Sequence, residues 1–363
     1  MMWAMLNGSF LGSRGSIFSG LSLSGFSDEE IRRSWRAFAK GQWSITKLLT
    51  AWRDHIFDEG EWKRHNYEGY RAVSVDITSF HRPKLKSWIG KIYQGIAGKA
   101  LKAIGIGIIA DVGSVETQRI AIPRKLLRSK NEEGSEKTLQ LDILKWISRH
   151  QAPDEVFLFD AGFSLKELQQ EGIKRYVIRQ AANCTVRRNQ LPTYQGKGAR
   201  PQYGKLIRPL ARRYKDKTIP ATPYDKEGSF ELEGRVIEFH SWHDILRSDQ
   251  KVSETAETFN IFTFFDPLYT NPLVLACPLA LAAKSIFLFY RDRWPVEQVP
   301  LVSKQLLGCK RAFVFNSESI FRLPELALLA GNILTYLAAT SPSIPSGFWD
   351  QNPKKRQVAF AGL

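Results

Sequence analysis

The first sixty or so residues have apolar positions at helical spacing. Ser27 and Glu30 form a capping-box sequence in front of one apolar stripe, and Gly41 marks the expected end of that helix. A second stripe runs from Ile45 to Trp52. The stretch before Ser27 has no sustained apolar run, which predicts a loose terminus and not a signal peptide. We therefore expect residues 1–68 to form an N-terminal helical segment.

From Tyr70 onwards the spacing becomes that of short strands separated by helical stretches. Strands are expected over residues 71–78, 104–112, 118–122, 155–160 and 175–180, and helices over residues 139–146 and 164–172. Three strands, a helix, a strand, a helix and a strand follow the order of the ribonuclease H-like fold, an α/β sheet with helices on both faces. Residues 69–183 are expected to form the first part of such a core.

The regular pattern stops between Lys174 and Lys217. This stretch has 13 Lys and Arg residues and a single acid, Asp216, with tyrosines and glycines interleaved. Cations suit phosphates and aromatic faces suit bases, so the stretch predicts a nucleic-acid surface. A solvated loop with ordinary surface charge is the alternative. The candidate DNA contacts are Arg187, Arg188, Arg212 and Arg213.

Alternating positions return after this basic stretch. They predict antiparallel strands over residues 229–241 and 258–265, so residues 184–271 are expected to be a β-rich basic insertion. A further strand over 273–276 and a buried, strongly apolar helix over 323–338 place the second part of the core at residues 272–340.

The last residues differ from the rest. Residues 341–363 contain prolines, serines and the basic run from Lys354 to Arg356, and we expect a tail.

Composition indicates a polyanionic partner. The 363 residues include 52 Lys and Arg against 36 Asp and Glu, a formal charge of +16, which favours nucleic acid over an anionic membrane. The apolar run over residues 272–290 is interrupted by Pro278 and Lys284, so no membrane span is expected there. Three isolated cysteines lack zinc-site spacing and are expected to be inert thiols in a reducing compartment: Cys184, Cys277 and Cys309.

Four polar side chains late in the chain fall at offsets that share one face of a helix. Tyr290, Arg293, Glu297 and Lys304 are three, four and seven residues apart, and about 3.6 residues per turn bring them to nearly one azimuth. A carboxylate flanked by cations suits phosphodiester chemistry, because it can hold a divalent metal while Arg and Lys hold phosphate. A helix with an ordinary Arg–Glu pair is the alternative. Prolines at positions 295 and 300 predict a kink in this helix.

Two more acids stand at the ends of expected strands. Asp76 closes the strand over residues 71–78, and Asp160 closes the strand that begins at Glu155. A carboxylate at the end of a buried strand is costly unless it is paired or binds a metal, although a single such Asp is often only a cap. With Glu297 they predict a shared site of hard oxygen ligands, which favours Mg²⁺ or Mn²⁺ over zinc.

These motifs occur together and in one order. The segments Asp76–Thr78, Asp160–Phe163 and Tyr290–Lys304 resemble the three catalytic motifs of the DDE transposases of the bacterial insertion-sequence type with the YREK signature. The resemblance covers roughly residues 70–338. The long stretch between the second and third motifs is similar to the mostly-β insertion of that group.

The resemblance implies an enzyme that cleaves DNA and transfers its strands. Asp76, Asp160 and Glu297 would be the catalytic residues and would hold two Mg²⁺ ions, replaceable by Mn²⁺, that activate a water or a 3′-hydroxyl for in-line displacement. The other signature residues, Tyr290, Arg293 and Lys304, would grip phosphates near the transposon end.

Trp294 lies beside them. The resemblance implies that it stacks on an unpaired base; packing in the core is the alternative.

The implied partners are double-stranded DNA, both as terminal inverted repeats and as target, and a second copy of the chain in a DNA-bound homodimer. No membrane is implied, and the expected location is the bacterial cytoplasm, at the nucleoid. Two other functions stay open: a related metal-dependent nuclease that does not join DNA, and a domesticated, inactive DNA-binding protein. The presence of all three acids argues against an inactive DNA-binding protein, because mutations accumulate at catalytic acids that are no longer needed.

Overall fold

The computed structural model describes residues 1–311, 314–316, 318–345 and 349–353. The chain divides into two compact units, each assembled from separate stretches of sequence. Unit 1 consists of Met1–Asn66, Arg71–Trp146 and Asp292–Leu363, and unit 2 of Tyr67–Tyr70 and Ile147–Arg291. Both units mix helices with strands, so the α/β class expected from the sequence is confirmed.

The sheet of unit 1 is antiparallel. Its central strand β5 (Lys99–Val115) pairs with β3 (Tyr70–His81) on one side and β6 (Gln118–Arg128) on the other, and also with the short β1 (Lys63–Arg64) and β4 (Lys91–Gln94). The two-residue β2 (Asn66–Tyr67) precedes β3.

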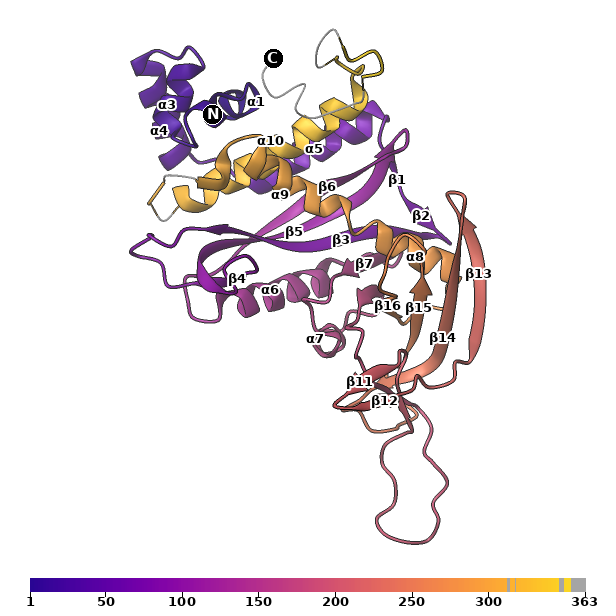
Figure 1. The fold of residues 1–363 in the computed structure, drawn as a ribbon. Coiled ribbons are helices and arrows are strands. Elements are labelled where there is room, and N and C mark those ends of the chain that lie inside the picture. Colours follow the sequence, from indigo (N-terminus) through magenta and orange to yellow (C-terminus); the bar gives the residue numbers. More distant parts are fainter. Residues whose placement is uncertain (312–313, 317, 346–348, 354–363) are drawn as a thin grey trace. The chain divides into compact units, whose positions relative to one another are not determined.

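Helices cover both faces of this sheet. The helices α5 (Ile45–Glu59), α9 (Pro295–Gln305) and α10 (Ser319–Thr340) lie on one face and α6 (Ser135–His150) on the other (Figure 1). Neighbouring positions of β5 point to opposite faces: Ile104 belongs to the core cluster that includes α10, whereas a Cβ at Gly105 would meet Leu139 of α6.

The expected loose terminus is wrong, because the first residues are helical and buried. The helices α1 (Met2–Leu6), α2 (Ser9–Gly12) and α3 (Ile17–Leu23) bury Met5, Phe10 and Leu21 in one cluster with residues of α10. Gly308 has φ of 67°, and a Cβ there would come within 2.4 Å of the Phe10 carbonyl oxygen. Tertiary packing thus orders helices too short to be stable alone.

Two other sequence predictions in unit 1 are confirmed. At the start of α4 (Asp28–Lys40), the Glu30 N–H donates to Ser27 Oγ at 3.4 Å and the Ser27 N–H donates to Glu30 Oε2 at 2.8 Å, which is the capping box. The apolar stretch expected over 323–338 is α10. This helix is long and apolar enough to cross a membrane, but 83% of its apolar window is buried inside the structure, as in a core helix. A 3₁₀ turn, η1 (Cys309–Arg311), stands between α9 and α10.

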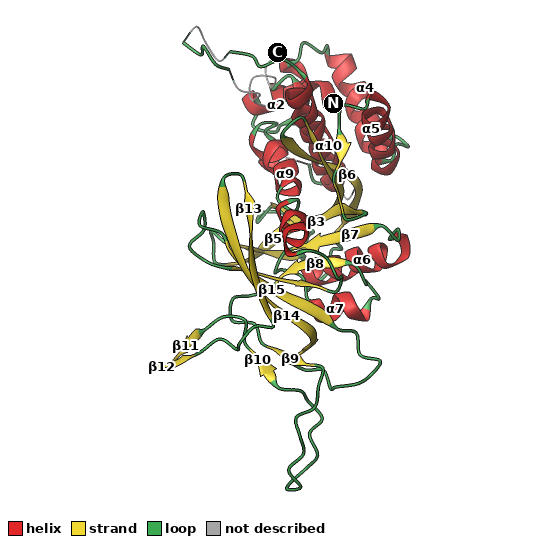
Figure 2. Ribbon diagram, turned by 90° about the vertical axis from the view of Figure 1, so that its right-hand side faces the viewer, coloured by secondary structure: helices red, strands yellow, loops and turns green. Residues whose placement is uncertain are grey.

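Unit 2 has a mixed sheet (Figure 2). The strand β7 (Glu155–Phe159) runs parallel to β8 (Tyr176–Arg179), with α7 (Leu165–Gln170) between them in sequence. The following strands are antiparallel, in the spatial order β8, β16 (Leu273–Cys277), β15 (Phe259–Phe265), β14 (Arg235–Arg247), β9 (Val186–Arg188) and β10 (Leu206–Ile207). A separate hairpin joins β11 (Arg212–Tyr214) to β12 (Lys217–Ile219).

The continuous strand expected over residues 229–241 is instead a hairpin. The strand β13 (Lys226–Leu232) turns into β14 through Glu233 and Gly234, whose φ angles are 53° and 74°. Positive φ at both central residues is the geometry that matches strand twist in a two-residue hairpin. Helix α8 (Ala283–Arg291) places Phe287 against Phe230 of β13 and Phe264 of β15.

Candidate catalytic site

The expected signature helix is two helices. Helix α8 ends at Arg291, α9 begins at Pro295, and a turn over residues 292–294 separates them. The kinked single helix is therefore wrong, and the reason is that Pro295 occupies the first helical position of α9, where its missing N–H leaves no helical bond unmade. Tyr290 ends up on α8, Arg293 and Trp294 in the turn, and Glu297 and Lys304 on α9.

Arg293 and Glu297 form a close ion pair. Arg293 Nη2 lies 2.6 Å from Glu297 Oε1, and the Arg293 side chain is 8% exposed against 32% for Glu297. The spacing is i,i+4, but Arg293 precedes the helix and is buried. The Arg–Glu pair that we held as the alternative is thus present, with its arginine withdrawn from water. The carboxylate compensates the charge of a guanidinium withdrawn from water.

Lys304 reaches the first acidic motif. Its Nζ donates to Thr78 Oγ1 at 2.7 Å and lies 5.0 Å from the centre of the Phe80 ring. Burial lowers the pKa of Lys304 to about 8, with a further lowering by Lys310, while the charge of Asp76 acts in the opposite direction. The late signature lysine is thus in electrostatic contact with the motif Asp76–Thr78 on β3.

Asp76 does not end its strand. β3 continues to His81, and Asp76 is half-buried opposite Ile108 of β5. The strand extends because the residues after Asp76 keep pairing with β5, up to His81 opposite Ala103. The expected strand end is corrected, and Asp76 sits in the middle of an antiparallel ladder.

Asp160 directly follows β7, which ends one residue before the expected strand end. The Tyr290 hydroxyl donates to Asp160 Oδ1 at 3.4 Å, and both side chains are half-buried. The pair lies wholly within unit 2. The signature tyrosine therefore contacts the second acidic motif.

Each predicted acid is thus paired with a residue of the signature. Asp76 and Glu297 belong to unit 1 and Asp160 to unit 2, and their convergence on one site stays a prediction. Within residues 1–311, 314–316, 318–345 and 349–353 no group of three His, Cys, Asp or Glu side chains is placed to hold a metal ion. The donor set itself, carboxylate oxygens from partly exposed side chains, fits a hard divalent cation.

Trp294 stands out from the surface. Its side chain is 60% exposed, so the alternative of a core tryptophan is wrong. Neighbouring Arg293 is buried, and the turn therefore presents the two side chains to different environments. Stacking of Trp294 on an unpaired base stays a prediction.

Two of the four arginines proposed for DNA contact bind the protein itself. Arg187 Nε donates to the Ser248 carbonyl oxygen at 2.8 Å, and its guanidinium lies 5.1 Å from the centre of the Tyr203 ring. Arg188 makes a bidentate ion pair with Asp225, which lowers the pKa of that carboxyl. These contacts give both side chains a structural role in unit 2.

The other two proposed arginines are less constrained. Arg212 is half-buried and donates to the Asn183 carbonyl oxygen at 3.4 Å, whereas Arg213 is exposed on β11. Their contact with DNA stays a prediction.

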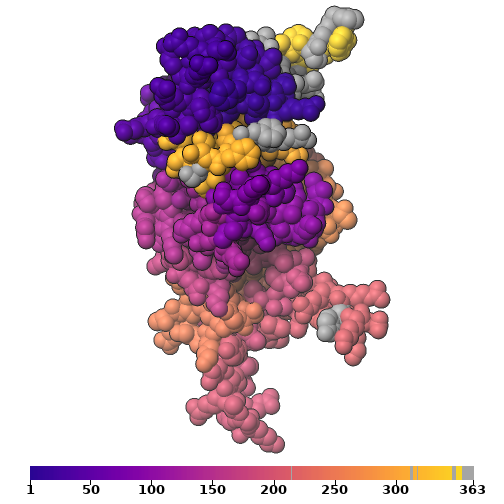
Figure 3. Space-filling model, turned by 90° about the vertical axis from the view of Figure 1, so that its left-hand side faces the viewer, coloured from indigo at the N-terminus to yellow at the C-terminus, as the bar shows by residue number. Residues whose placement is uncertain are grey.

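Exposed cations concentrate in the loop between β9 and β10. Residues 189–205 project from the surface of unit 2 (Figure 3). Lys197, Arg200 and Lys205 are exposed, and the Arg200 guanidinium lies 5.9 Å from the centre of the exposed Tyr194 ring. The alternation of cation and aromatic ring expected for a nucleic-acid surface is present here.

Sequence reasoning missed a buried acid inside the signature. Asp292 stands between Arg291 and Arg293 and is fully buried, with His65 as a hydrogen-bonding partner and Arg119 as an ionic partner. The available signal was an acid flanked by two arginines at a helix junction.

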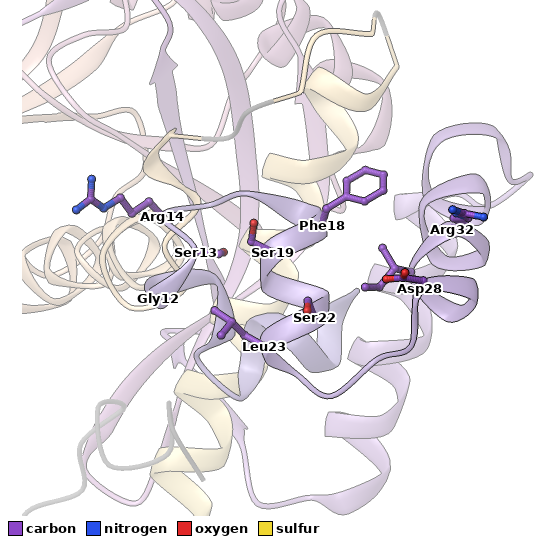
Figure 4. A pocket seen from close by; sticks show the side chains of 10 residues that line it. Gly12, Ser13, Arg14, Phe18, Ser19, Ser22, Leu23, Asp28 and Arg32 are labelled. Atoms are coloured by element: carbon purple, nitrogen blue, oxygen red, sulfur yellow. The ribbon is translucent and has the colours of Figure 1, made fainter.

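Two other groups add no chemistry to the site. Burial raises the pKa of Cys184 to about 11 and of Cys277 and Cys309 to about 12, as expected of inert thiols. A hollow of about 770 Å³ lies among α2, α3 and α4, lined by residues that include Arg14, Phe18, Asp28 and Arg32 (Figure 4). The predicted site residues are not among those that line it.

Comparison of the chain with models of known protein families and with curated proteins gives no match.

Proposed function

We propose that this chain is a DDE-type DNA transposase with the YREK signature, which cleaves and joins DNA at the ends of a mobile element. The pairing of signature residues with the acidic motifs carries this proposal: Tyr290 contacts Asp160, Arg293 contacts Glu297, and Lys304 contacts the motif Asp76–Thr78. Merely solvated polar side chains would not be expected to contact acidic motifs in three different stretches of the sequence.

The proposed catalytic core is ribonuclease H-like, interrupted by the β-rich insertion. The observed element order supports it: the antiparallel strands β3, β5 and β6 are followed by α6, β7, α7 and β8, with β7 and β8 parallel. The insertion strands β13, β14 and β15 come next, and α8 and α9 bring the signature after them.

The three acids of the proposal would hold two Mg²⁺ ions, or Mn²⁺ in their place, which supply activation of the attacking water or 3′-hydroxyl and stabilise the leaving oxygen. Arg293 orients Glu297 through their ion pair. A guanidinium has five N–H donors, so Arg293 can bind the carboxylate and a phosphate oxygen together. The Tyr290 hydroxyl orients Asp160 in the same way.

Lys304 brings a positive charge beside Asp76 in a site largely withdrawn from water. Electrostatic interactions are stronger in such a site, so its ammonium group neutralises phosphate charge more effectively than an exposed lysine. Thr78 fixes the position of the Lys304 ammonium.

Binding of double-stranded DNA, as terminal inverted repeats and as target, follows in the proposal from the charge of +16 and from the cationic loop 189–205. A homodimer on DNA and a location in the bacterial cytoplasm, at the nucleoid, belong to the same proposal.

Linear DNA that carries the sequences flanking the gene provides the test. With Mg²⁺ and a target plasmid, we expect breaks at the element ends and joined products, both abolished by a chelator. Breaks without joined products would instead support a nuclease. Binding without breaks would overturn the enzymatic proposal in favour of an inactive DNA-binding protein.

A further inference from the structure

The turn between α8 and α9 begins with a fully buried acid. Asp292 is 0% exposed and directly precedes Arg293. A carboxylate removed from water is costly unless charged or hydrogen-bonding groups replace the water. The groups that replace it therefore determine where this turn can lie.

A histidine and an arginine side chain hold the carboxylate. His65 Nδ1 lies 2.8 Å from Oδ2 of Asp292, and Arg119 Nε lies 3.4 Å from Oδ1. His65 stands between β1 and β2, and Arg119 is on β6. Because the two oxygens face partners from different parts of unit 1, the carboxylate is fixed in orientation as well as in position.

A third contact holds the backbone of the turn. The hydroxyl of Ser74, a fully buried residue of β3, donates to the Asp292 carbonyl oxygen at 2.6 Å. The anchors belong to the sheet: the His65 N–H donates to the Val112 carbonyl oxygen at 2.9 Å, and the Ala72 N–H donates to the His65 carbonyl oxygen at 3.4 Å. Both ends of Asp292 are thus tied to the framework of unit 1.

We propose that Asp292 is a positioning residue, which locks the turn to the sheet of unit 1 and thereby fixes the place from which Arg293 reaches Glu297 and a DNA phosphate. The carbonyl group held by Ser74 belongs to the peptide bond that leads into Arg293, so the restraint passes directly to the backbone of Arg293. This inference rests on the proposed function of Arg293 as a phosphate-binding residue.

A purely structural role makes a different prediction. A buried ion pair that only stabilises the fold affects DNA binding equally whether or not Arg293 is present, so its effect adds to that of any Arg293 substitution. A residue that acts through Arg293 loses its influence once Arg293 is removed.

The test is a double-mutant cycle of Asp292→Asn and Arg293→Ala, read as affinity for duplex DNA made from the sequences flanking the gene, in metal-free buffer. We expect Asp292→Asn to weaken binding about tenfold in the parent and less than about twofold in the Arg293→Ala background. Cleavage rates in Mg²⁺ should show the same dependence on background.

Asp111→Asn is the matched control. Asp111 of β5 is also a buried acid of unit 1, and its Oδ2 lies 2.8 Å from Arg53 Nη2. Its substitution should lower the unfolding temperature, while any effect on DNA affinity is the same in both backgrounds. Ser74→Ala, which removes only the hydrogen bond to the Asp292 carbonyl, supplies a milder second variant with the same coupling expected.

Equal losses of DNA affinity from Asp292→Asn in both backgrounds would overturn the positioning role. If Asp292→Asn does not fold, equal losses of DNA affinity from Ser74→Ala in both backgrounds would overturn it. A parent protein that neither binds nor cleaves this DNA would instead overturn the proposed function, and the positioning role with it. The two failures are thus distinguished by the parent alone.

Discussion

Two groups of cations, one in each unit, differ in how they are held. In unit 1, Arg293 is buried and Lys304 half-buried, and the two are held by Glu297 and Thr78. Lys197 and Lys205 in the loop of unit 2 are exposed. Exposed cations act on DNA mainly by releasing counterions, which gives affinity without geometry, whereas cations held by neighbouring side chains act at one fixed place. The net charge of the chain predicts the exposed group but gives no information about the group held near Glu297 and Thr78.

Among variants that test this difference between the two groups, Glu297→Gln should have the largest effect, a loss of cleavage activity. Loss of the carboxylate charge removes a proposed metal ligand, so cleavage should fall on the order of a hundredfold or more. DNA binding through the exposed loop should persist, as a gel shift beside a cleavage time course would measure. Because the variant also removes the ionic contact between Glu297 and the buried Arg293, the free energy of unfolding should fall by roughly 1–3 kcal/mol.

Glu325→Gln separates the two consequences. Glu325 of α10 is buried and pairs with Arg128 at 2.7 Å, so its substitution should cost comparable stability while leaving cleavage intact. Cleavage by Glu297→Gln at the parent rate would show that Glu297 is only an ion-pair residue.

Lys304→Met should lower activity and yet stabilise the fold at neutral pH. The pKa of Lys304 is about 8 in the folded protein, below the value of 10.5 for an ordinary lysine. The folded state therefore releases this proton first, and below pH 8 it bears the full cost of a buried charge. That cost disappears as the pH rises from about 8 to 10.5, because the unfolded chain then binds more protons than the folded one.

The variant has no such group, so its advantage in unfolding free energy should be present below pH 8 and decline above it. Lowering of the Lys304 pKa from 10.5 to about 8 corresponds to about 3.5 kcal/mol at about 1.4 kcal/mol per pKa unit, and the lost hydrogen bond to Thr78 subtracts about 1 kcal/mol, so a net gain of roughly 2–3 kcal/mol is expected at pH 7. Denaturant unfolding at several pH values measures it. A variant less stable than the parent at pH 7 would mean that Lys304 supports the fold.

Neutralising the exposed loop should alter binding without altering chemistry. Replacing Lys197, Arg200 and Lys205 by Gln removes up to three phosphate contacts, which should reduce the log–log slope of affinity against salt by about 3. The control replaces Arg32, Arg36 and Lys40, exposed cations of α4. Equal slopes for the loop variant and the parent would leave the loop as an ordinary solvated surface.

The smallest effect is expected from Trp294→Ala. Because the side chain is 60% exposed, the free energy of unfolding should change by less than about 1 kcal/mol. Binding to DNA with an unpaired base at its end should weaken by roughly 1–3 kcal/mol, the usual contribution of one base stacked on an aromatic ring, while binding to fully paired DNA is unchanged. Trp3→Ala, at a tryptophan 62% exposed on α1, is the control. The same loss on both DNAs would contradict stacking by Trp294.

What could be predicted from the sequence is what depends on near neighbours. The capping box at Ser27 and Glu30 and the strand that leads to Asp160 involve residues a few positions apart, and both are confirmed. The order of Asp76, Asp160 and the signature along the chain could likewise be read directly from the sequence. The long apolar stretch over residues 323–338 predicted helix α10.

The rest depends on partners far away in the chain. Phe10 is ordered by its approach to Gly308, and Asp76 lies within its strand because the next residues pair with β5. Arg188 forms an ion pair with Asp225, and no local sequence pattern connects these two residues. The turn that splits the signature is fixed by residues more than 170 positions away in sequence, which spacing alone does not reveal.

The discontinuous composition of unit 1 has a consequence for how the protein is made. Its strands β3, β5 and β6 end at Arg128, but α10, which buries Ile120 and Ile122 beneath Tyr336, begins only at Ser319. At about 5–20 residues per second, a ribosome needs roughly 10–40 s for the intervening chain. During that interval the hairpins of unit 2, whose strands follow one another in sequence, are free to close, while the sheet of unit 1 waits for its cover. A nascent chain would thus become competent only after both Glu297 and α10 have emerged from the ribosome.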